Sequence, residues 1–491
     1  MLCPSIRMLS APTRSAAPLP GWVRVVDGVC LLLLLLAIVV AVSGGFRERL
    51  FGLRLALTSP YRLLLWAVAL GGLRHTLVRR RPIYADLSER LAVLWRTAEA
   101  RAAVAAFMGT RPAILFVGYL AVFLVGFPTD ALPWRVSDNE FGNLPARWDV
   151  GWYLGIALDG YSFNEAMSAA GNQQNIVFFP AFPLLMRVSG RLLGGAPASF
   201  VWAATACSLL AFLAGLMYVH RLARDLVHDD GLASTAVWLV AAYPFALFFG
   251  APYTESLFLL GAAAALYHFR RGEIWRGGAW GFLVGLTRPN GCFLSVVLAV
   301  LALEPWLPRG LFGRDLAPRP APTAGGLVRS FAAASLPGVG MLVYSAYVWS
   351  LTGDPLTWAQ GHVAWGRSYQ GLSILVTERY RYLARSGLYA YTSQSGSDVI
   401  QVLGVLFVLA AMWPVARRFG LALALFIAIN ILPPLAAGGL LSAGRFSSVI
   451  FPAFIWLATV VPERHRSGWL TGFMALQALN AVMFFTWRQM F

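Results

Sequence analysis

The chain has 491 residues, of which 58% are hydrophobic and only 12% are charged. Soluble domains are closer to half apolar and a quarter charged, so the composition excludes an ordinary soluble protein. The formal net charge is +17, and the 39 basic residues include no lysine, which excludes a Schiff-base or P-loop lysine. The arginines lie in short loops between apolar stretches, a pattern that the positive-inside rule explains better than nucleic-acid binding does. We therefore expect a membrane protein with no nucleic-acid partner.

Apolar stretches recur along nearly the whole chain, each about long enough to cross a hydrocarbon core of roughly 30 Å as a helix. Helices are the expected form because a backbone in lipid must satisfy its own polar groups. The sequence predicts an all-α, multi-pass integral membrane protein with about 13 transmembrane helices. The predicted spans are residues 24–43, 61–77, 113–128, 198–219, 232–250, 254–270, 277–288, 291–304, 330–351, 397–414, 419–436, 447–462 and 468–487.

The orientation follows from the first span. No small-residue cleavage site clearly follows it, so we interpret it as an uncleaved signal anchor with residues 1–23 in the cytoplasm. Alternation then places most arginine-bearing loops inside, as the charge rule demands, including the Arg-rich loop 74–112. Loop 44–60 is the exception, because it carries three arginines on the outside. Segments 129–197 and 352–396 become long extracytoplasmic loops, and the expected location is the plasma (inner) membrane.

Two segments need a separate interpretation. Residues 176–193 contain two prolines and end in Arg187 and Arg191, so we expect an interfacial amphipathic helix in the first outer loop. The short spans 277–288 and 291–304 predict two half-length helices that turn at the outer side. The alternative is one long tilted helix with a proline kink.

One carboxylate in the first outer loop differs from its neighbours. Asp149 lies between Trp148 and Trp152, next to Arg147 and close to Tyr153. A poorly solvated carboxylate at a membrane surface can be tuned toward base function, and aromatic rings can stack on sugar faces. The alternative is an interfacial belt of aromatic residues with an incidental Asp.

Further polar residues lie at the predicted outer ends of spans. Arg288 stands at the proposed half-helix turn, where a guanidinium near membrane depth usually has an anionic partner. The other candidates on this side are Tyr253, Glu255, His362, Arg367 and Arg445. Such a face suits transfer from a phosphate-linked donor, because a base deprotonates the acceptor hydroxyl and cations stabilise the departing phosphate.

The sequence resembles the GPI mannosyltransferase II family, including its prokaryotic members, within the GT-C superfamily of membrane glycosyltransferases. The resemblance covers about residues 113–465. It rests on Arg147-Trp148-Asp149 through Gly160-Tyr161, Asn175 to Pro180 with Pro183-Leu184-Leu185, Tyr253 to Phe258, Arg288 to Gly291, Gly353-Asp354-Pro355 and Ser442 to Phe446.

The resemblance implies a GT-C-type helical bundle whose first outer loop carries the essential acid, Asp149. It implies an inverting transfer, most often of mannose, from a polyprenyl-phosphate donor to a hydroxyl of a glycolipid or glycan. Arg288 and Arg445 would bind the donor phosphate, and Tyr253 and Glu255 would line or support the site. The family usually has Ser at position 289 and Tyr at position 446, so we assign no hydrogen-bonding role to Phe446.

This reading sets the expected organisation. Residues 1–23 form a cytoplasmic segment, 24–112 two additional transmembrane helices with the Arg-rich loop, 113–465 the catalytic membrane domain and 466–491 the final helix. No metal or other cofactor is expected, since the first outer loop has no Asp-x-Asp pair, although a divalent metal stays possible. The alternatives are a transporter or flippase of lipid-linked sugars and a non-catalytic subunit of a cell-envelope assembly.

Overall fold

The computed structural model describes residues 19–43, 46–50, 53–79, 82, 92–131, 133–307, 311–316 and 320–490, with backbone only for those between 41 and 57. The predicted cytoplasmic segment lies mostly outside these residues. The chain divides into two compact units, Met1–Trp95 and Arg96–Phe491. The expected boundary at residue 112 differs from this division, because a continuous helix crosses it.

The first unit is a helical pair joined by a β-hairpin. Helix α1 (Gly21–Ser43) and helix α2 (Pro60–Leu77) pack against each other. Strands β1 (Phe46–Leu50) and β2 (Leu53–Leu57) pair antiparallel within the predicted outer loop 44–60. Arg74 is not in the Arg-rich loop as expected, because it lies in the last turn of α2, with its Nε 2.7 Å from Asp27 Oδ1. Both side chains are buried, and each supplies the opposite charge that the other needs between apolar helices.

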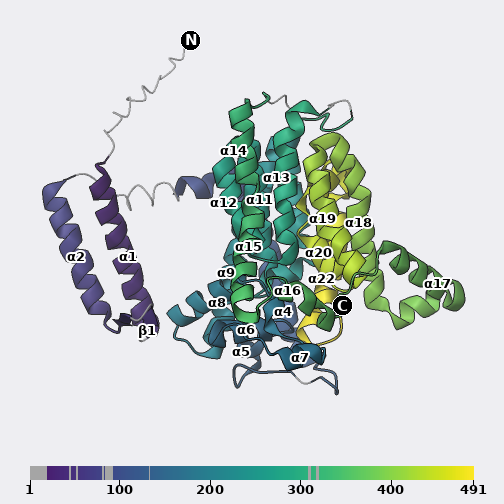
Figure 1. Cartoon of the computed structure of the whole chain (residues 1–491), viewed down its shortest axis with the longest axis horizontal. Coiled ribbons are helices and arrows are strands. Elements are labelled where there is room, and N and C mark those ends of the chain that lie inside the picture. The colour runs from purple at the N-terminus through teal and green to yellow at the C-terminus, as the bar shows by residue number, and fades with distance from the viewer. Residues whose placement is uncertain are drawn as a thin grey trace, which may run out of the picture. The chain divides into compact units, whose positions relative to one another are not determined.

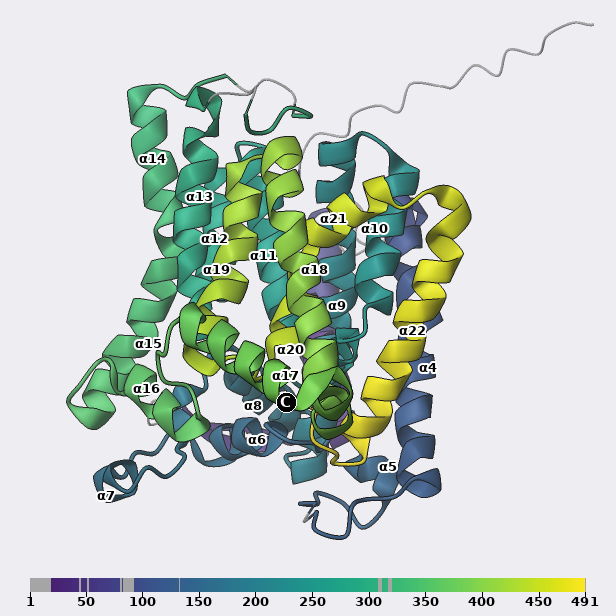
Figure 2. The same ribbon diagram turned by 90° about the vertical axis from the view of Figure 1, so that its right-hand side faces the viewer.

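The second unit is a bundle of long helices, visible in Figures 1 and 2. Its long helices are α4 (Ala98–Leu124), α9 (Pro197–Val227), α10 (Asp230–Ala242), α11 (Glu255–Arg270), α12 (Ile274–Gly285), α13 (Leu294–Leu303), α14 (Ala324–Ala334), α15 (Leu336–Thr352), α18 (Gly396–Phe419), α19 (Leu421–Gly438), α21 (Phe451–Val460) and α22 (Glu463–Phe485). Helix α9 packs against α4, α8, α10 and α11, and alanine and glycine on these helices allow the close approach.

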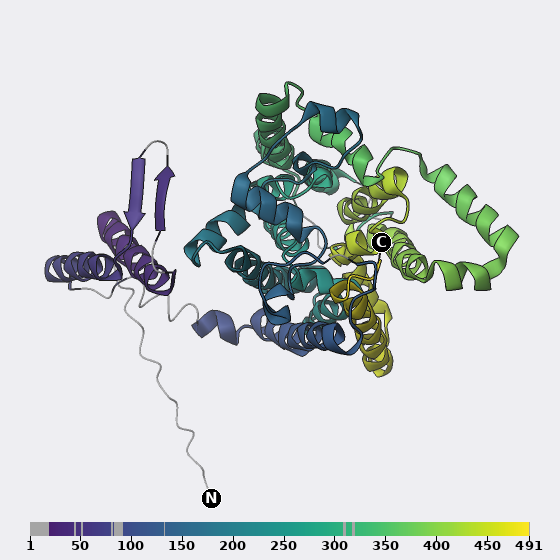
Figure 3. The ribbon, with the colours of Figure 1, turned by 90° about the horizontal axis from the view of Figure 1, so that it is seen from below.

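Further elements connect the helices of the bundle, and α5, α6, α7, α8 and α16 lie toward its lower end in Figures 1 and 2. They are α5 (Glu140–Asn143), α6 (Val150–Asp159), α7 (Glu165–Ala169), η1 (Asn175–Val177), α8 (Ala181–Leu192), α16 (Thr357–Gln360), η5 (Gly361–Trp365) and α20 (Ala443–Ser448). Helix η2 (Ala246–Gly250) joins α10 to α11, η3 (Pro289–Phe293) joins α12 to α13, and η4 (Glu304–Trp306) follows α13. Helix α17 (Leu372–Gln394) lies beside α18 and reaches away from the bundle, as Figure 3 shows in light green.

The all-helical membrane architecture is confirmed, with the hairpin as the exception among the described residues. Eight helices in the described part of the chain are long and apolar enough to cross a membrane. The other five predicted spans coincide with α2, α10, α11, α12 and α21, which are shorter or less apolar. The count of about 13 spans is therefore not confirmed, whereas a multi-pass integral membrane protein is.

The predicted loop 74–112 is wrong over its second half, where α4 begins at Ala98. Thr97 caps the helix by accepting the backbone N–H of Ala100 at 3.3 Å. The charged residues that suggested a loop have partners on neighbouring helices. Glu99 pairs with Arg221 at 3.0 Å, and the buried Arg111 donates to the carbonyl oxygen of Ala241 at 2.8 Å.

The segment 352–396 is also more ordered than a loop, since it forms α16, η5 and α17. Helix α17 is interrupted at Gly387, whose φ of 78° lies in the left-handed region that glycine adopts at no steric cost. The expected extracytoplasmic placement of both long segments stays a prediction.

Both short segments form helices as predicted, whereas their placement at the membrane interface and at the outer side stays a prediction. Helix α8 covers most of the predicted amphipathic segment, and its 12 residues span only about 18 Å, too short to cross a bilayer. Helices α12 and α13 are two separate short helices joined by η3, and Gly281 of α12 lies near α13, since a Cβ on it would lie 3.5 Å from Leu298 Cδ1. Gly285 lies against α15, where a Cβ would meet the Pro337 carbonyl oxygen at 1.9 Å. This contact sets the position of the turn that carries Arg288.

Candidate active site

Asp149 lies at the start of α6, at the lower end of the bundle in Figure 2. The preceding residue, Trp148, has a φ of 53°, an unusual value for a bulky side chain. The Tyr253 hydroxyl accepts the N–H of Asp149 at 3.1 Å and donates to the carbonyl oxygen of Arg147 at 3.1 Å. One buried tyrosine on the segment before α11 therefore bridges both sides of the strained residue.

Arg445 joins two carboxylates from distant parts of the chain. Its Nη1 donates to Asp149 Oδ2 at 2.9 Å, and its Nε donates to Glu255 Oε1 at 2.6 Å. The guanidinium also lies over the Tyr253 ring, 4.5 Å from its centre. Burial by itself would lower the pKa of Arg445, but Glu255 and Asp149 outweigh burial and raise this pKa well above its usual value. Arg445 is therefore a permanent cation.

The two carboxylates differ in access. The side chain of Asp149 is 26% exposed, whereas that of Glu255 is 1% exposed. A hydroxyl group arriving from outside can reach Asp149 and not Glu255. Glu255 is therefore the buried ion-pair partner of Arg445, and Asp149 is the partner that solvent and substrate can reach.

Arg288 is a second, less satisfied guanidinium in the same cluster. Its Nη2 lies 3.7 Å from Glu255 Oε1, too long for a hydrogen bond, and its Cζ lies 4.1 Å from the centre of the Phe258 ring. Its side chain is only 7% exposed. Neither its Nε nor its Nη2 has a hydrogen-bond partner among the described residues. Two buried, unused N–H donors on a cation provide binding capacity for an anion.

Arg367 adds a third positive charge near this cluster. It is within electrostatic range of Arg445 and Asp149, and it donates to the Leu441 carbonyl oxygen at 3.1 Å. Its guanidinium stacks over Phe446, 5.1 Å from the ring centre, so this ring makes a cation–π contact. Three guanidinium groups against two carboxylates leave one positive charge in excess.

His362 does not add to this charge. Burial, with a smaller contribution from Arg367, lowers the pKa of His362 to about 4. The imidazole is therefore neutral at physiological pH. The predicted binding role of His362 is therefore that of a neutral hydrogen-bonding group.

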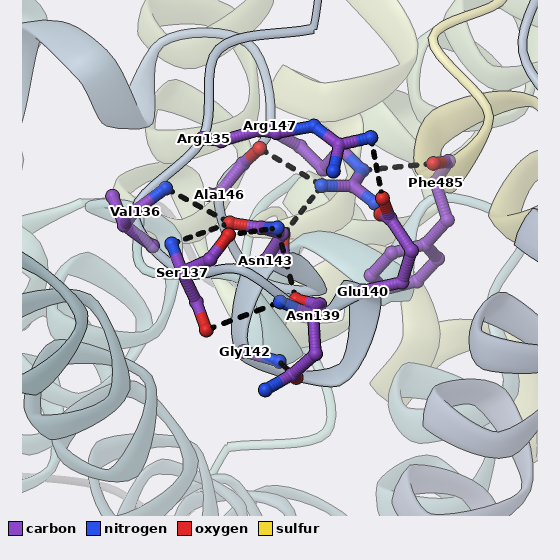
Figure 4. A network of polar contacts seen from close by, with 10 residues as sticks. All are labelled: Arg135, Val136, Ser137, Asn139, Glu140, Gly142, Asn143, Ala146, Arg147 and Phe485. Carbon is purple, nitrogen blue, oxygen red and sulfur yellow. Dashed lines mark hydrogen bonds and ion pairs between the residues drawn. The ribbon is translucent and has the colours of Figure 1, made fainter.

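Arg147 was expected to bind substrate, but its guanidinium points away from the cluster. Figure 4 shows it among backbone carbonyl groups, where it donates to Phe485 at 2.8 Å, to Ala146 at 3.0 Å and to Asn143. Asn143 in turn accepts the N–H groups of Val136 and Ser137. The contacts of Arg147 hold the loop before Asp149 in place, and a direct role in binding stays a prediction.

The end of α22 holds the same loop. Phe484 and Phe485 are the last residues of α22, where backbone carbonyl groups accept hydrogen bonds from outside the helix. That of Phe484 accepts the N–H of Trp487 at 3.4 Å. The Trp148 indole N–H donates to the carbonyl oxygen of Phe484 at 3.1 Å. Arg147 Nε donates to the carbonyl oxygen of Phe485 at 2.8 Å. The Trp148 ring also lies 4.9 Å from the Trp487 ring, and Trp487 likewise has a positive φ of 58°. The C-terminal segment therefore positions Asp149.

Replacing Trp487 with alanine is expected to lower kcat for the reaction proposed below by about 10- to 100-fold, because small misplacements of a catalytic group are costly. The KM for the donor is expected to change little, since the cation cluster is intact. Trp469→Ala is the matched control, because Trp469 lies on α22, away from the segment that follows the helix, and its only ring contact among those described is with Phe473. Equal kcat values for the two variants would contradict the positioning role.

Aromatic rings surround the accessible side of Asp149. Trp152 lies 5.9 Å from the Phe178 ring and 5.1 Å from the Trp365 ring. Tyr153 is buried and contacts Phe178 and Tyr253 edge to face. The sequence analysis named Trp152 and Tyr153 but missed Trp365, which is distant in sequence from the other two.

The sequence analysis also missed Gln401 at the predicted start of a span. Its amide donates to the Met490 carbonyl oxygen at 2.6 Å and accepts the N–H of Gly444, the residue before Arg445. The signal was present, because a buried polar residue in an apolar span usually has a specific partner. No group of three His, Cys, Asp or Glu side chains suited to a metal occurs in the part of the chain that the structure describes.

The fold and the site define a multi-pass membrane protein with a buried cluster of carboxylates and guanidinium groups, accessible at Asp149. Residues 128–303 match the family model described as Mannosyltransferase (PIG-V). This match confirms the resemblance for a segment that contains Asp149, Tyr253, Glu255 and Arg288, while Arg445 lies beyond it.

Curated relatives agree with this family. The chain is 31% identical over 153 residues to GPI alpha-1,6-mannosyltransferase 2 of Rattus norvegicus, covering 30% of this chain and 29% of that protein. It is 28% identical over 192 residues to the Mus musculus protein of the same name, covering 35% and 36%. The aligned region thus spans about a third of the length of these relatives.

Among solved structures, the chain is similar to the oligosaccharyltransferase of Archaeoglobus fulgidus in complex with Zn and sulfate. The TM-score is 0.36 and the identity 14%, with coverage of 76% of this chain and 53% of that chain. The same enzyme in its apo form gives a TM-score of 0.35.

Proposed function

We propose that the chain is a glycosyltransferase of the GT-C type that moves mannose from a polyprenyl-phosphate donor to a hydroxyl group of a glycolipid or glycan. The observation that carries the proposal is the cluster around Arg445. It combines one accessible carboxylate with a buried guanidinium, Arg288, that has unused donors. The family match over residues 128–303 supports mannose as the transferred sugar.

The cluster suits such a transfer step by step. The donor phosphate binds between Arg288 and Arg445, where the excess positive charge stabilises an anion. Asp149 accepts the proton of the acceptor hydroxyl as its oxygen bonds to the anomeric carbon of the sugar. The bond between that carbon and the phosphate oxygen breaks, and polyprenyl phosphate leaves with the bonding electron pair, neutralised by the arginines. Attack opposite the leaving group inverts the anomeric configuration.

Arg445 links the two halves of this mechanism. Before the donor binds, its Nη1 is occupied by Asp149. A phosphate bound to Arg445 competes for this donor group and frees the carboxylate to act as a base. We therefore propose that donor binding precedes activation of the acceptor. None of these steps needs a metal ion. The distribution of arginines between the loops favours an active site on the extracytoplasmic side of the plasma membrane.

The test uses purified protein in detergent with radiolabelled polyprenyl-phosphate mannose and a membrane lipid extract. Label is expected to move into a new product whose anomeric configuration, read by NMR, is opposite to that of the donor. Polyprenyl-phosphate glucose, which presents the same phosphate and lipid, is the matched control and is expected to react more slowly. Absence of transfer together with flux of the donor across liposomes would favour the transporter alternative.

A further inference from the structure

A separate cavity of about 280 Å³ lies between α17, α18 and the C-terminal end of α19. The side chains of Glu378, Arg379 and Asp398 line it, together with Gln370 and the backbone of residues 435–441. None of these residues belongs to the cluster around Arg445. The cavity is therefore a site distinct from that cluster.

Two carboxylates, Glu378 and Asp398, provide the hydrogen-bond acceptors of the cavity wall. Asp398 pairs with Arg379 at 2.8 Å, whereas Glu378 has no ion-pair or hydrogen-bond partner in the described part of the chain. The backbone of this wall is largely satisfied, since the carbonyl oxygen of Ala436 accepts the N–H groups of Gln370 and Gly371, and that of Leu441 accepts from Arg367. The carboxylates are therefore the acceptors that a ligand can use. Two carboxylates against one guanidinium, beside a helix C-terminus, make the site unfavourable for a phosphate.

The cavity shares a wall with the candidate active site. Gly366 and Leu441 line the cavity, and the guanidinium of the next residue, Arg367, donates to the Leu441 carbonyl oxygen. Arg367 in turn is within electrostatic range of Asp149 and Arg445. Helix α20, which carries Arg445, begins two residues after Leu441. Arg367 and the segment that leads into α20 therefore connect the cavity wall to the candidate active site.

We propose that this cavity binds a neutral sugar ring of the acceptor. The inference rests on the proposed transferase function and names the part of the acceptor that the enzyme recognises. A sugar presents many hydroxyl donors, which match the carboxylate acceptors of Glu378 and Asp398. The volume is at the lower end of ligand pockets, about 300–1,000 Å³, which suits one ring rather than an oligosaccharide. The polar walls do not suit a polyprenyl chain.

The test measures binding without turnover. Methyl α-D-mannopyranoside is titrated into the purified full chain in detergent, and saturation-transfer NMR reports its Kd. Glu378→Gln is expected to weaken binding about tenfold, because hydrogen bonds to a charged acceptor are the stronger ones. Leu375→Trp, which fills the cavity, is expected to abolish binding. Glu463→Gln, an exposed carboxylate on α22, is the matched control and is expected to bind as wild type does.

Three outcomes would overturn the proposal: no binding to the wild-type chain, equal Kd values for wild type and both cavity variants, or displacement of the sugar by inorganic phosphate. The result is independent of the transferase proposal, because Asp149→Asn is expected to bind the probe as wild type does whether or not it is active. If transfer fails while binding and its loss in Glu378→Gln are observed, the cavity is a sugar site in a protein of another function.

Discussion

Replacing Asp149 with asparagine is expected to lower kcat for mannosyl transfer by about 10²- to 10⁴-fold, the usual contribution of a general base. Asparagine keeps the shape of the side chain and an oxygen that can accept from Arg445, but it cannot take a proton from the acceptor. The other carboxylate of the cluster cannot substitute, because Glu255 is 1% exposed and already bound to Arg445. Radiolabel transfer from the donor to the lipid extract measures the effect.

The control for this experiment is Asp159→Asn at the other end of α6. Asp159 is exposed and has no part in the cluster, so its variant is expected to retain wild-type kcat. Binding of polyprenyl phosphate to Asp149→Asn is expected to be as tight as to wild type or tighter, because Arg445 loses a competing charge. Transfer by Asp149→Asn at the wild-type rate would remove Asp149 from the mechanism.

Replacing Arg445 with leucine is expected to destabilise the protein by about 3–5 kcal/mol, the cost of leaving a buried charge unpaired. Glu255 would keep only the distant Arg288 as a partner, at 3.7 Å. Asp149 would lose the ion pair that orients it. Denaturant titration of the detergent-solubilised protein, followed by tryptophan fluorescence, measures the change.

Two further variants make this prediction specific. Arg135→Leu removes an ion pair of similar length, 2.7 Å to Glu140, but Arg135 is 54% exposed, so the loss is expected to be at most about 1 kcal/mol. The double variant Arg445→Leu with Glu255→Leu is expected to regain part of the stability, since the buried carboxylate is removed with its partner. A loss in Arg445→Leu no larger than that in Arg135→Leu would show that the cluster does not act as a buried ion network.

Stability and transfer are separate readouts for Arg445. The double variant is expected to remain inactive even where it regains stability, because the donor phosphate still lacks one of its two cations. This combination distinguishes a structural role from a binding role. Recovery of transfer in the double variant would contradict the assignment of Arg445 to the donor phosphate.

The positions of the apolar helices follow from composition and local pattern. Lipid requires each backbone to satisfy its own hydrogen bonds, so every long apolar stretch had to become a helix, and all the predicted spans coincide with helices. Errors arose where charged residues have partners on other helices. Arg111 and Glu99 were placed in a loop, but helix α4 includes both residues. Arg111 donates to the carbonyl oxygen of Ala241, and Glu99 forms an ion pair with Arg221.

The sequence also singled out Asp149, because a carboxylate between tryptophans at a membrane surface is chemically unusual wherever the chain folds. It identified Arg288, Glu255 and Arg445 as candidates through family motifs. Only the tertiary structure decided how they act. Arg445, which is 296 positions from Asp149, pairs with it and with Glu255 through long-range packing that has no local signature. The same packing turned Arg147 onto the end of α22 and left Arg288 with unused donors. Local physics thus determined the elements and the reactive residue, and the contacts between distant helices determined which charges are paired and which are free to bind.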